Sequence, residues 1–278
     1  MKLIAESGST KTIWKLKTDD AVETYETIGF NPLFISVGEI KEELGKSEMV
    51  FYKDKVKEIY FYGASCSSDA RKKVIYDGLS FFFINATIVE VDHDLNAACI
   101  GLFGDKKGIA CILGTGSNSC IWDGEKVTEN IEALGYVLGD EAGGAWFGKK
   151  IVSMYLYKRL PEQISAYIKT HYHGDKNDIY HAVYTQKFPN RYLASYAKIL
   201  TEFREDPFVQ NLLEQGFEEF IQYHILPYSA NASYTWGFVG SIAYYFQEEL
   251  KRVCKRHGAS QILIQKSPVD GLLAWHSN

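Results

Sequence analysis

A run of small and hydroxyl-bearing residues between two apolar segments constrains the fold of this chain more than any other stretch. Ile109–Leu113 predicts a buried strand, and Cys120–Trp122 predicts a second strand that ends at a turn containing Gly124. The residues between the two strands are Gly114, Thr115, Gly116, Ser117, Asn118 and Ser119. Glycine lets backbone N–H groups approach a ligand and hydroxyl groups add donors, so such a turn can hold a phosphate. A tight hairpin with solubilising serines explains the same residues equally well.

A second turn of the same kind near the N-terminus favours the phosphate-binding interpretation. Lys2–Ala5 predicts a strand, Glu6–Thr12 is a polar turn that contains glycine, and Ile13–Leu16 predicts the returning strand. A third strand is expected over Ala21–Ile28, which makes residues 1–28 a β-meander. Two strand–turn–strand units in widely separated parts of the chain predict a duplicated fold, with a nucleotide between its halves.

Four segments together resemble a known family. In chain order they are Glu6–Thr12 (ESGSTKT), Asp92–Ala98 (DHDLNAA), Gly114–Ser119 (GTGSNS) and Leu138–Ala145 (LGDEAGGA). The set is similar to the N-acetylglucosamine kinase-like branch of the BadF/BadG/BcrA/BcrD ATPase family, which belongs to the superfamily of actin, sugar kinases and Hsp70. The resemblance covers nearly the whole chain. It implies an α/β fold of two ribonuclease H-like (actin-like ATPase) domains with a nucleotide cleft between them.

The expected domain boundaries follow from the resemblance and from the apolar patterning. The N-terminal actin-like ATPase domain is expected at residues 1–104, joined by a C-terminal helix at 268–278. The C-terminal domain is expected at 105–267. A helical insertion is expected at about 161–227, where helical patterning is continuous. The length of 278 residues is suitable for two domains.

The resemblance implies that both domains contact ATP. The residues expected to bind the nucleotide are Ser7, Gly8, Ser9, Thr10 and Lys11 in the first domain, Gly114, Thr115, Gly116 and Gly240 in the second, and Gly271 in the terminal helix. Glu6 is the expected ligand of a magnesium ion, acting partly through water. The family usually has Asp where this chain has Glu6.

Asp94 is the candidate general base. It follows a predicted strand at Thr87–Val91 and precedes residues that recur on one helical face from Leu95 to Phe103. One interpretation is a helix N-cap, for which Asp is a preferred residue. The other is a carboxylate at the carboxyl edge of a sheet, where ligands bind in α/β folds. In phosphoryl transfer such a carboxylate would accept the proton of the attacking hydroxyl.

The resemblance also implies a set of sugar-binding residues, namely Asn31, Ser117, Asn118 and Asp140. Two of them have simpler explanations. Asn31 precedes Pro32, a pair typical of turns, and Asp140 stands with Glu141 where a negative charge suits the start of a helix. His171 and His173 are expected to be loop histidines rather than metal ligands.

The leading functional hypothesis is an ATP-dependent kinase that phosphorylates a hydroxyl group of a small amino sugar resembling N-acetylglucosamine, with ATP and Mg²⁺. Two other classes stay open. One is an activator ATPase of a dehydratase or reductase, which the same family includes. The other is a non-catalytic nucleotide or sugar sensor, an alternative suggested by Glu6. A homodimer is expected by analogy with the family.

Composition limits the remaining choices. The net charge of −5 argues against nucleic acid as the main partner. Five cysteines, an odd number at wide spacings, predict buried thiols in a reducing cytoplasm rather than disulfides or a zinc site. No apolar run approaches the roughly 20 residues of a membrane helix, and no signal peptide is recognisable, so a cytoplasmic protein without membrane contact is expected.

Overall fold

Short segments of alternating apolar residues build the first of two five-stranded sheets. The computed structural model describes residues 1–172 and 174–277. The strand order in the first sheet is β3-β2-β1-β4-β5, with β1 antiparallel to β2 and parallel to β4. Its strands are β1 (Lys2–Ser7), β2 (Lys11–Lys17), β3 (Val22–Ile28), β4 (Glu58–Gly63) and β5 (Ile88–His93). The predicted N-terminal meander is therefore confirmed.

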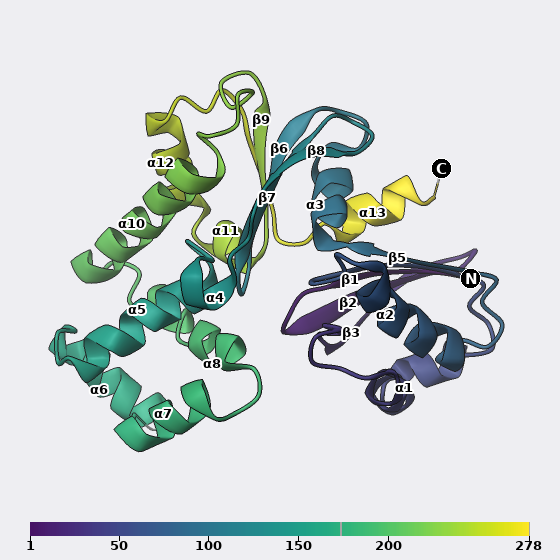
Figure 1. Cartoon of the computed structure of the whole chain (residues 1–278), viewed down its shortest axis with the longest axis horizontal. Helices are drawn as coiled ribbons and strands as arrows, with labels where there is room; N and C mark the ends of the chain where they lie inside the picture. The colour runs from purple at the N-terminus through teal and green to yellow at the C-terminus, as the bar shows by residue number, and fades with distance from the viewer. Residues whose placement is uncertain (173, 278) are drawn as a thin grey trace. The chain divides into compact units, whose positions relative to one another are not determined.

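The period of two along these strands separates the two faces of the sheet. Leu3, Ala5 and Trp14 pack with α1 (Val37–Lys46) and α2 (Asp69–Phe82) on one face. Ile4 and Tyr62 pack on the other face, against residues of α3 (Asp94–Phe103) and α13 (Val269–Trp275) (Figure 1). A short 3₁₀ helix, Glu48–Tyr52, follows α1.

The second sheet repeats the order of the first. Its order is β10-β9-β6-β7-β8, and β6 is antiparallel to β7 and parallel to β9. The central strand β6 thus corresponds to β1, and the polar turn after it leads to an antiparallel neighbour in both sheets. Its strands are β6 (Gly108–Leu113), β7 (Ser117–Trp122), β8 (Val127–Ile131), β9 (Thr235–Val239) and β10 (Ile262–Gln265). The predicted duplication is therefore present in the topology.

Helices that pack around the second sheet form the largest core of the protein. Phe147, Phe217 and Phe238 are fully buried in it, and the predicted apolar stripe of the longest helix faces it. The helices are α4 (Gly135–Leu138), α5 (Gly144–Leu156), α6 (Glu162–His171), α7 (Lys176–Tyr184), α8 (Pro189–Ser195), α9 (Lys198–Glu202), α10 (Pro207–His224), α11 (Ser241–Tyr245) and α12 (Gln247–Arg256).

The chain divides into two units by its internal contacts. Unit 1 comprises Met1–Lys106, Gly124–Val127 and Ser267–Asn278, and unit 2 comprises Lys107–Asp123 and Thr128–Lys266. The C-terminal helix α13 belongs to unit 1, where it packs against α3.

Three local predictions from the sequence differ from the structure. The apolar pattern predicts one helix from Ile242 to about Arg256, but the helix is divided at Phe246, whose backbone leaves the helical region and whose ring is buried in the core. The run Ser67–Asp69 predicts a cap for the helix that follows; Ser68 occupies the N-cap position of α2, but its hydroxyl makes no capping hydrogen bond. The glycines from Gly135 predict a loop, but Gly135–Leu138 forms the single helical turn α4.

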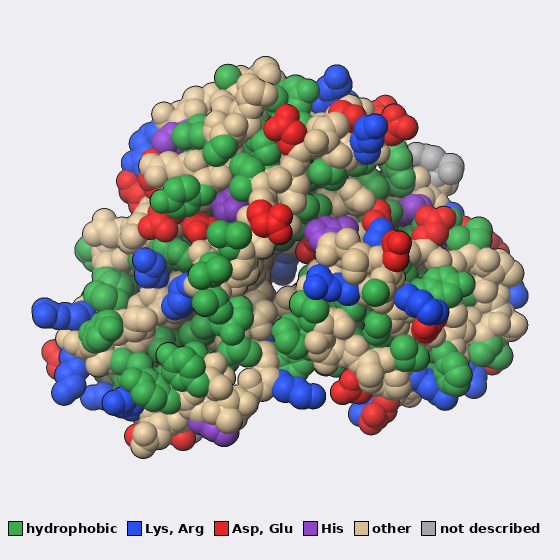
Figure 2. All heavy atoms as spheres, viewed as in Figure 1, with side chains coloured by type: hydrophobic (Ala, Val, Ile, Leu, Met, Phe, Trp, Pro, Cys, Tyr) green, Lys and Arg blue, Asp and Glu red, His purple; other side chains and the backbone are tan. Residues whose placement is uncertain are grey.

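Surface and thiol properties agree with the compositional arguments. All five cysteines are buried thiols that take part in no disulfide. Positive and negative side chains are interspersed on the face drawn in Figure 2, and the described residues there form no single basic patch. Within residues 1–172 and 174–277, no helix is both long and apolar enough to cross a membrane.

Candidate active site

The Glu6–Thr12 turn of unit 1 is fixed by the backbone segment that follows β3. Gly8 donates its N–H to the carbonyl of Lys11 at 3.0 Å, and Gly29 donates to the carbonyl of Thr10 at 3.0 Å. A Cβ atom on Gly29 would lie 2.3 Å from the carbonyl oxygen of Gly8. Because only glycine permits this approach, the segment at Gly29 closes tightly over the turn.

The side chain of Ser7 is used inside unit 1. Its Oγ lies 2.7 Å from Oγ1 of Thr12 and accepts the N–H of Phe30 at 2.9 Å. Thr12 in turn donates to the carbonyl of Ile28 at 2.9 Å. Both hydroxyl groups are buried, so they stabilise the turn itself. The nucleotide contacts expected of Ser7, Gly8, Ser9, Thr10 and Lys11 stay predictions.

The surroundings of Glu6 disfavour the charged form of its carboxyl group. Burial raises the pKa of Glu6 from 4.5 to about 7. The hydroxyl of Ser267 donates to Oε2 at 3.2 Å and acts to lower the pKa, whereas the negative charge of Asp94 acts to raise it. Oxygen ligands of this kind suit Mg²⁺, which usually takes one or two carboxylates together with waters and phosphates. The residues therefore fit a magnesium ion that is completed by a nucleotide.

A metal site made entirely of protein ligands does not occur in the described part of the chain. Residues 1–172 and 174–277 contain no group of three or more His, Cys, Asp or Glu side chains arranged to hold an ion. His171 is exposed as predicted, but it is the last residue of α6 rather than a loop residue. His173 lies outside the described residues.

Asp94 lies where β5 ends and α3 begins, as expected. The N-cap interpretation of Asp94 is wrong, because the capping side chain is that of His93, whose Nδ1 accepts the N–H of Leu95 at 3.2 Å. Asp94 is the first helical residue. Its Oδ1 is buried and has no hydrogen-bond partner among the described residues, although Nδ1 of His93 lies 2.9 Å away.

The neighbouring carboxylate, Asp92, is in a different state. It accepts hydrogen bonds from Nζ of Lys72 at 2.7 Å and from Nδ2 of Asn96 at 2.6 Å. Burial acts to raise the pKa of Asp92, but Lys72 and Asn96 outweigh burial and lower it. Of the two carboxylates in this motif, Asp92 is therefore neutralised within the fold, whereas Oδ1 of Asp94 faces the titratable Nδ1 of His93.

The polar turn of unit 2 packs against the start of α5. Gly144 and Ala145 donate their N–H groups to the carbonyls of Gly114 and Thr115, both at 2.8 Å. A Cβ atom on Gly116 would lie 2.7 Å from the carboxylate oxygens of Asp140, whose Oδ1 accepts the N–H of Ser117 at 3.2 Å. The structure thus brings Gly116 and Ser117 against Asp140. The expected contacts of Gly114, Thr115 and Gly116 with ATP stay predictions.

Asp140 and Ser117 each have a feature that suits a polar ligand. Burial raises the pKa of Asp140; the N–H of Ser117 lowers it, and the charge of Glu141 raises it further. The Oγ atom of Ser117 is buried and has no hydrogen-bond partner among the described residues. An unsatisfied buried hydroxyl is costly, and a hydroxyl group of a ligand would satisfy it.

The amide oxygens of the two expected asparagine ligands already accept hydrogen bonds within their own units. Oδ1 of Asn31 accepts the N–H of Leu33 at 3.0 Å, and the Asn31 residue is almost fully buried in unit 1. Oδ1 of Asn118 accepts the N–H of Ser119 at 2.9 Å and Nδ2 of Asn130 at 3.1 Å. The turn expected for Asn before Pro is confirmed, and the sugar contacts of Asn31 and Asn118 stay predictions.

Gly240 and Gly271 both have structural reasons to be glycine. Gly240 has a φ of +118° between β9 and α11, and a Cβ atom there would lie 2.3 Å from the carbonyl oxygen of Leu113. Gly271 lies where α13 crosses α3, and its Cβ would lie 2.5 Å from the carbonyl oxygen of Gly101. The nucleotide contacts expected of Gly240 and Gly271 stay predictions.

One buried polar pair beside the candidate site was not anticipated from the sequence. Nε2 of His224 lies 3.0 Å from Oε2 of Glu141, the residue after Asp140. A signal was present, because His224 stands four residues after Phe220 and so falls on the buried stripe of α10. A histidine on an apolar stripe needs a polar partner.

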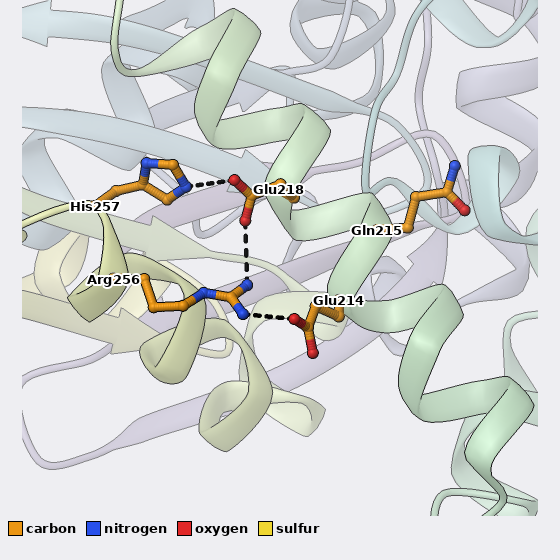
Figure 3. A pocket seen from close by; sticks show the side chains of 5 residues that line it. All are labelled: Glu214, Gln215, Glu218, Arg256 and His257. Carbon is orange, nitrogen blue, oxygen red and sulfur yellow. Dashed lines mark hydrogen bonds and ion pairs between the residues drawn. The ribbon is translucent and has the colours of Figure 1, made fainter.

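A surface hollow on unit 2 contains none of the predicted site residues. Its volume is about 490 Å³, and Glu214, Gln215, Glu218, Arg256 and His257 line it (Figure 3). Arg256 bridges Glu214 and Glu218, and His257 contacts Glu218 at 2.5 Å. These ion pairs join α10 to α12, which makes the hollow a structural charge network.

The two sheets share one strand order, and each has a polar turn after its central strand. This arrangement defines the class of actin-like ATPase folds, to which sugar kinases belong. No protein-family model matches the sequence, and no curated protein matches it. Among solved structures, the "Putative N-acetylglucosamine Kinase" of Porphyromonas gingivalis is 34% identical, with a TM-score of 0.91 over 99% of this chain and 98% of that one. The chain belongs to the N-acetylglucosamine kinase-like branch of the BadF/BadG/BcrA/BcrD ATPase family.

Two more distant structures share the fold. A "Putative N-acetylglucosamine Kinase" from Chromobacterium violaceum is 15% identical, with a TM-score of 0.72 over 99% of each chain. A ROK family glucokinase from Streptomyces griseus, in complex with glucose and AMPPNP, is 13% identical, with a TM-score of 0.56 over 99% of this chain and 98% of that one. At these identities the similarity concerns the fold.

Proposed function

We propose that this protein is an ATP-dependent kinase that transfers a phosphoryl group to a hydroxyl of a small amino sugar, with N-acetylglucosamine as the first candidate. The relationship to the Porphyromonas gingivalis protein, named for that activity, supports the choice of sugar. The nucleotide analogue in the glucokinase of the same fold supports ATP as the donor. The observation that carries the proposal is the buried Oδ1 of Asp94, which faces Nδ1 of His93 at 2.9 Å and accepts no other hydrogen bond from the described residues.

Asp94 acts as the general base in this proposal. A carboxylate oxygen without a donor is ready to accept the proton of a sugar hydroxyl as that hydroxyl attacks the γ-phosphate. His93 leaves this oxygen available when its Nδ1 is unprotonated, the state in which Nδ1 accepts the N–H of Leu95. Asp92 is unsuited to the role, since Lys72 and Asn96 hold both of its oxygens.

Glu6 and the polar turns serve the nucleotide. Magnesium bound at Glu6 would supply positive charge that offsets the charge of the ATP phosphates during transfer. The backbone of Ser7–Lys11 in unit 1 and of Gly114–Gly116 in unit 2 would bind the phosphates, with Gly240 and Gly271 completing the nucleotide contacts.

The sugar is bound by Ser117 and Asp140 in this proposal, with Asn31 and Asn118 as further ligands. The unsatisfied Oγ of Ser117 can donate a hydrogen bond to one sugar hydroxyl, and the carboxylate beside it can accept one from an adjacent hydroxyl. A buried carboxylate with raised pKa gains from such a donor, because a hydroxyl of the ligand replaces lost hydration.

The activator ATPase is not favoured. Its iron–sulfur cluster requires cysteine thiolates, and the five cysteines here are buried. Burial raises the pKa of Cys66 and of Cys254 to about 12, so these thiols stay protonated. A cytoplasmic location, where ATP is plentiful, and a homodimer remain part of the proposal.

A coupled assay of ADP release tests the proposed function. The purified chain is supplied with ATP, Mg²⁺ and, one at a time, N-acetylglucosamine, N-acetylmannosamine, N-acetylmuramic acid, glucosamine and glucose. We expect one amino sugar to stimulate ADP release in the wild type and not in Asp94→Asn. Nucleotide binding without release for every sugar would favour the sensor alternative instead.

A further inference from the structure

The side chain of His224 is buried and pairs with Glu141, which is itself largely shielded from water. The side chain of His224 is 6% exposed, and its ring stacks on Phe220 at 4.9 Å and 19°. Nε2 faces Glu141 at 3.0 Å, while Nδ1 is buried and has no hydrogen-bond partner among the described residues. The hydrogen bond with Glu141 therefore offsets part of the cost of burying the polar imidazole ring.

The backbone of His224 is fastened to the sheet that carries Ser117. Oγ of Ser119, on β7, donates to the carbonyl of His224 at 2.8 Å and lies 2.9 Å from the hydroxyl of Tyr228. That hydroxyl accepts the N–H of Ile131, on β8, at 3.0 Å. The end of α10 is thereby fixed relative to β7 and β8. Anything that His224 holds is fixed relative to the same strands.

The loop that His224 holds has an unfavourable backbone. Asp140 and Ala142 have φ values of +59° and +56°, in the left-handed region that residues other than glycine rarely adopt. Such conformations persist only where surrounding contacts hold them. Glu141 lies between these two residues, and its side chain is tied to His224. The carboxylate of Asp140 is tied to the N–H of Ser117, and its carbonyl accepts the N–H of Gly143 at 2.8 Å.

We infer that His224 and Glu141 are a positioning pair that holds the strained Asp140 loop so that Asp140 and Ser117 present one preformed surface to the sugar. The inference rests on the proposed function of Asp140 and Ser117. It adds to that function a determinant of sugar affinity located on α10, outside the residues expected to touch the sugar. Because the pair touches neither ATP nor the reacting hydroxyl in this scheme, its loss weakens sugar binding while ATP binding is retained.

The chain offers a matched control for this pair. His257 and Glu218 form another histidine–glutamate contact, at 2.5 Å, between α12 and α10 and away from the Asp140 loop. His224→Leu and His257→Leu each remove one such contact. Glu141→Ala removes the partner of His224, and His224→Gln keeps an amide that can donate to Glu141.

The experiment measures the KM for sugar, the KM for ATP and the melting temperature of each variant. We expect His224→Leu and Glu141→Ala each to raise the sugar KM by about 10-fold or more, with the ATP KM changed by less than about 2-fold. The double variant should be no worse than either single variant, since both remove one contact. His224→Gln should recover part of the sugar affinity, and His257→Leu should leave both KM values unchanged.

A second measurement separates this inference from the proposed function. Hydrogen–deuterium exchange of peptides covering 114–119 and 139–143 reports on the loop without any sugar. Faster exchange of both segments in His224→Leu, and not in His257→Leu, supports the positioning role even if no sugar is turned over by the wild type. Unchanged exchange there, or equal rises in the KM for sugar and for ATP, overturns it.

Discussion

Nδ1 of His93 lies 2.9 Å from Oδ1 of Asp94 while it accepts the backbone N–H of Leu95 at 3.2 Å. In a neutral imidazole the lone pair of Nδ1 is occupied by the N–H of Leu95, so Nδ1 donates no proton to the carboxylate. A protonated imidazole would donate to Asp94 instead and would compete with a sugar hydroxyl for Oδ1. The state of His93 thus controls whether the candidate base is free.

Asp94→Asn should abolish most turnover and leave the fold intact. The amide keeps the size of the side chain but cannot accept a proton, and loss of a general base costs ~10²–10⁴-fold in kcat. The melting temperature and the affinity for ATP should stay close to those of the wild type. Asp92→Asn is the matched control: it weakens the contact with Lys72 and should lower stability more than kcat. Near-normal turnover by Asp94→Asn would mean that the base lies elsewhere.

His93→Asn should change how stability depends on pH. Burial lowers the pKa of His93, but Asp94 and Asp92 outweigh burial and raise it above 6.5, with Lys72 opposing them. Native His93 thus binds its proton more tightly than unfolded His93, so it contributes stability below about pH 6.5 that is lost as the pH rises through the folded pKa. Asparagine can still cap α3. On acidification, the melting temperature of the wild type should rise relative to that of His93→Asn. A constant difference in melting temperature across the pH range would contradict this.

Glu6→Gln should stabilise the metal-free protein at neutral and alkaline pH. The pKa of Glu6 is raised from 4.5 to about 7, so the native state binds a proton that the unfolded chain releases. Wild-type stability therefore falls as the pH rises between these two values, and the neutral glutamine escapes that loss. In thermal unfolding with a chelator, the melting temperature of Glu6→Gln should exceed that of the wild type at about pH 8 and equal it at about pH 4.

The same Glu6→Gln protein should be a poor kinase, because an amide is a weak ligand for Mg²⁺. Glu6→Asp is the conservative comparison and should keep part of the magnesium-dependent activity. If Glu6→Gln keeps full turnover with Mg²⁺, Glu6 does not hold the metal.

Gly116→Ala should weaken sugar binding. A Cβ atom at this position would lie 2.7 Å from the carboxylate of Asp140, so that carboxylate must move away from Ser117. Gly114→Ala is the matched control, because a Cβ atom there meets nothing within 4 Å. Calorimetric titration of sugar should show a loss of affinity in Gly116→Ala and no such loss in Gly114→Ala, with ATP titrated in parallel. A loss confined to ATP would support the family-based assignment of Gly116 to the phosphates.

Gly271→Ala should destabilise unit 1 by about 2 kcal/mol, a cost typical of overpacking. The added methyl group would lie 2.5 Å from the backbone oxygen of Gly101, so α3 and α13 would have to separate. Denaturant unfolding measures the change. An undiminished stability combined with lost ATP affinity would instead indicate a role in nucleotide binding alone.

The parts of this fold that could be predicted are those encoded by local pattern. The β1–β2 and β6–β7 hairpins follow from apolar runs on either side of polar turns, and the buried face of α10 follows from its helical period. The position of Asp94 between β5 and α3 follows from the same reasoning.

The remaining features depend on contacts between distant residues. The local sequence does not reveal whether a hydroxyl group in a polar turn points toward a ligand or toward the protein interior. The hydroxyl of Ser7 points inward, where it bonds to Thr12 and Phe30. The division of the helix at Phe246 accompanies burial of that ring in the core. The contact between His224 and Glu141 joins residues 83 positions apart, so neither segment alone reveals it.

The return of α13 to unit 1 has a consequence for synthesis on the ribosome. Ile4, Tyr62 and Ala97 form an apolar surface that Val269 and Leu272 cover. Those two residues emerge only after the whole of unit 2 has been made. Most of unit 1 is therefore translated before unit 2, and unit 1 is completed only after unit 2. A nascent chain that stops short of α13 leaves this apolar surface of unit 1 exposed to water. Chaperones recognise exposed apolar surfaces of this kind.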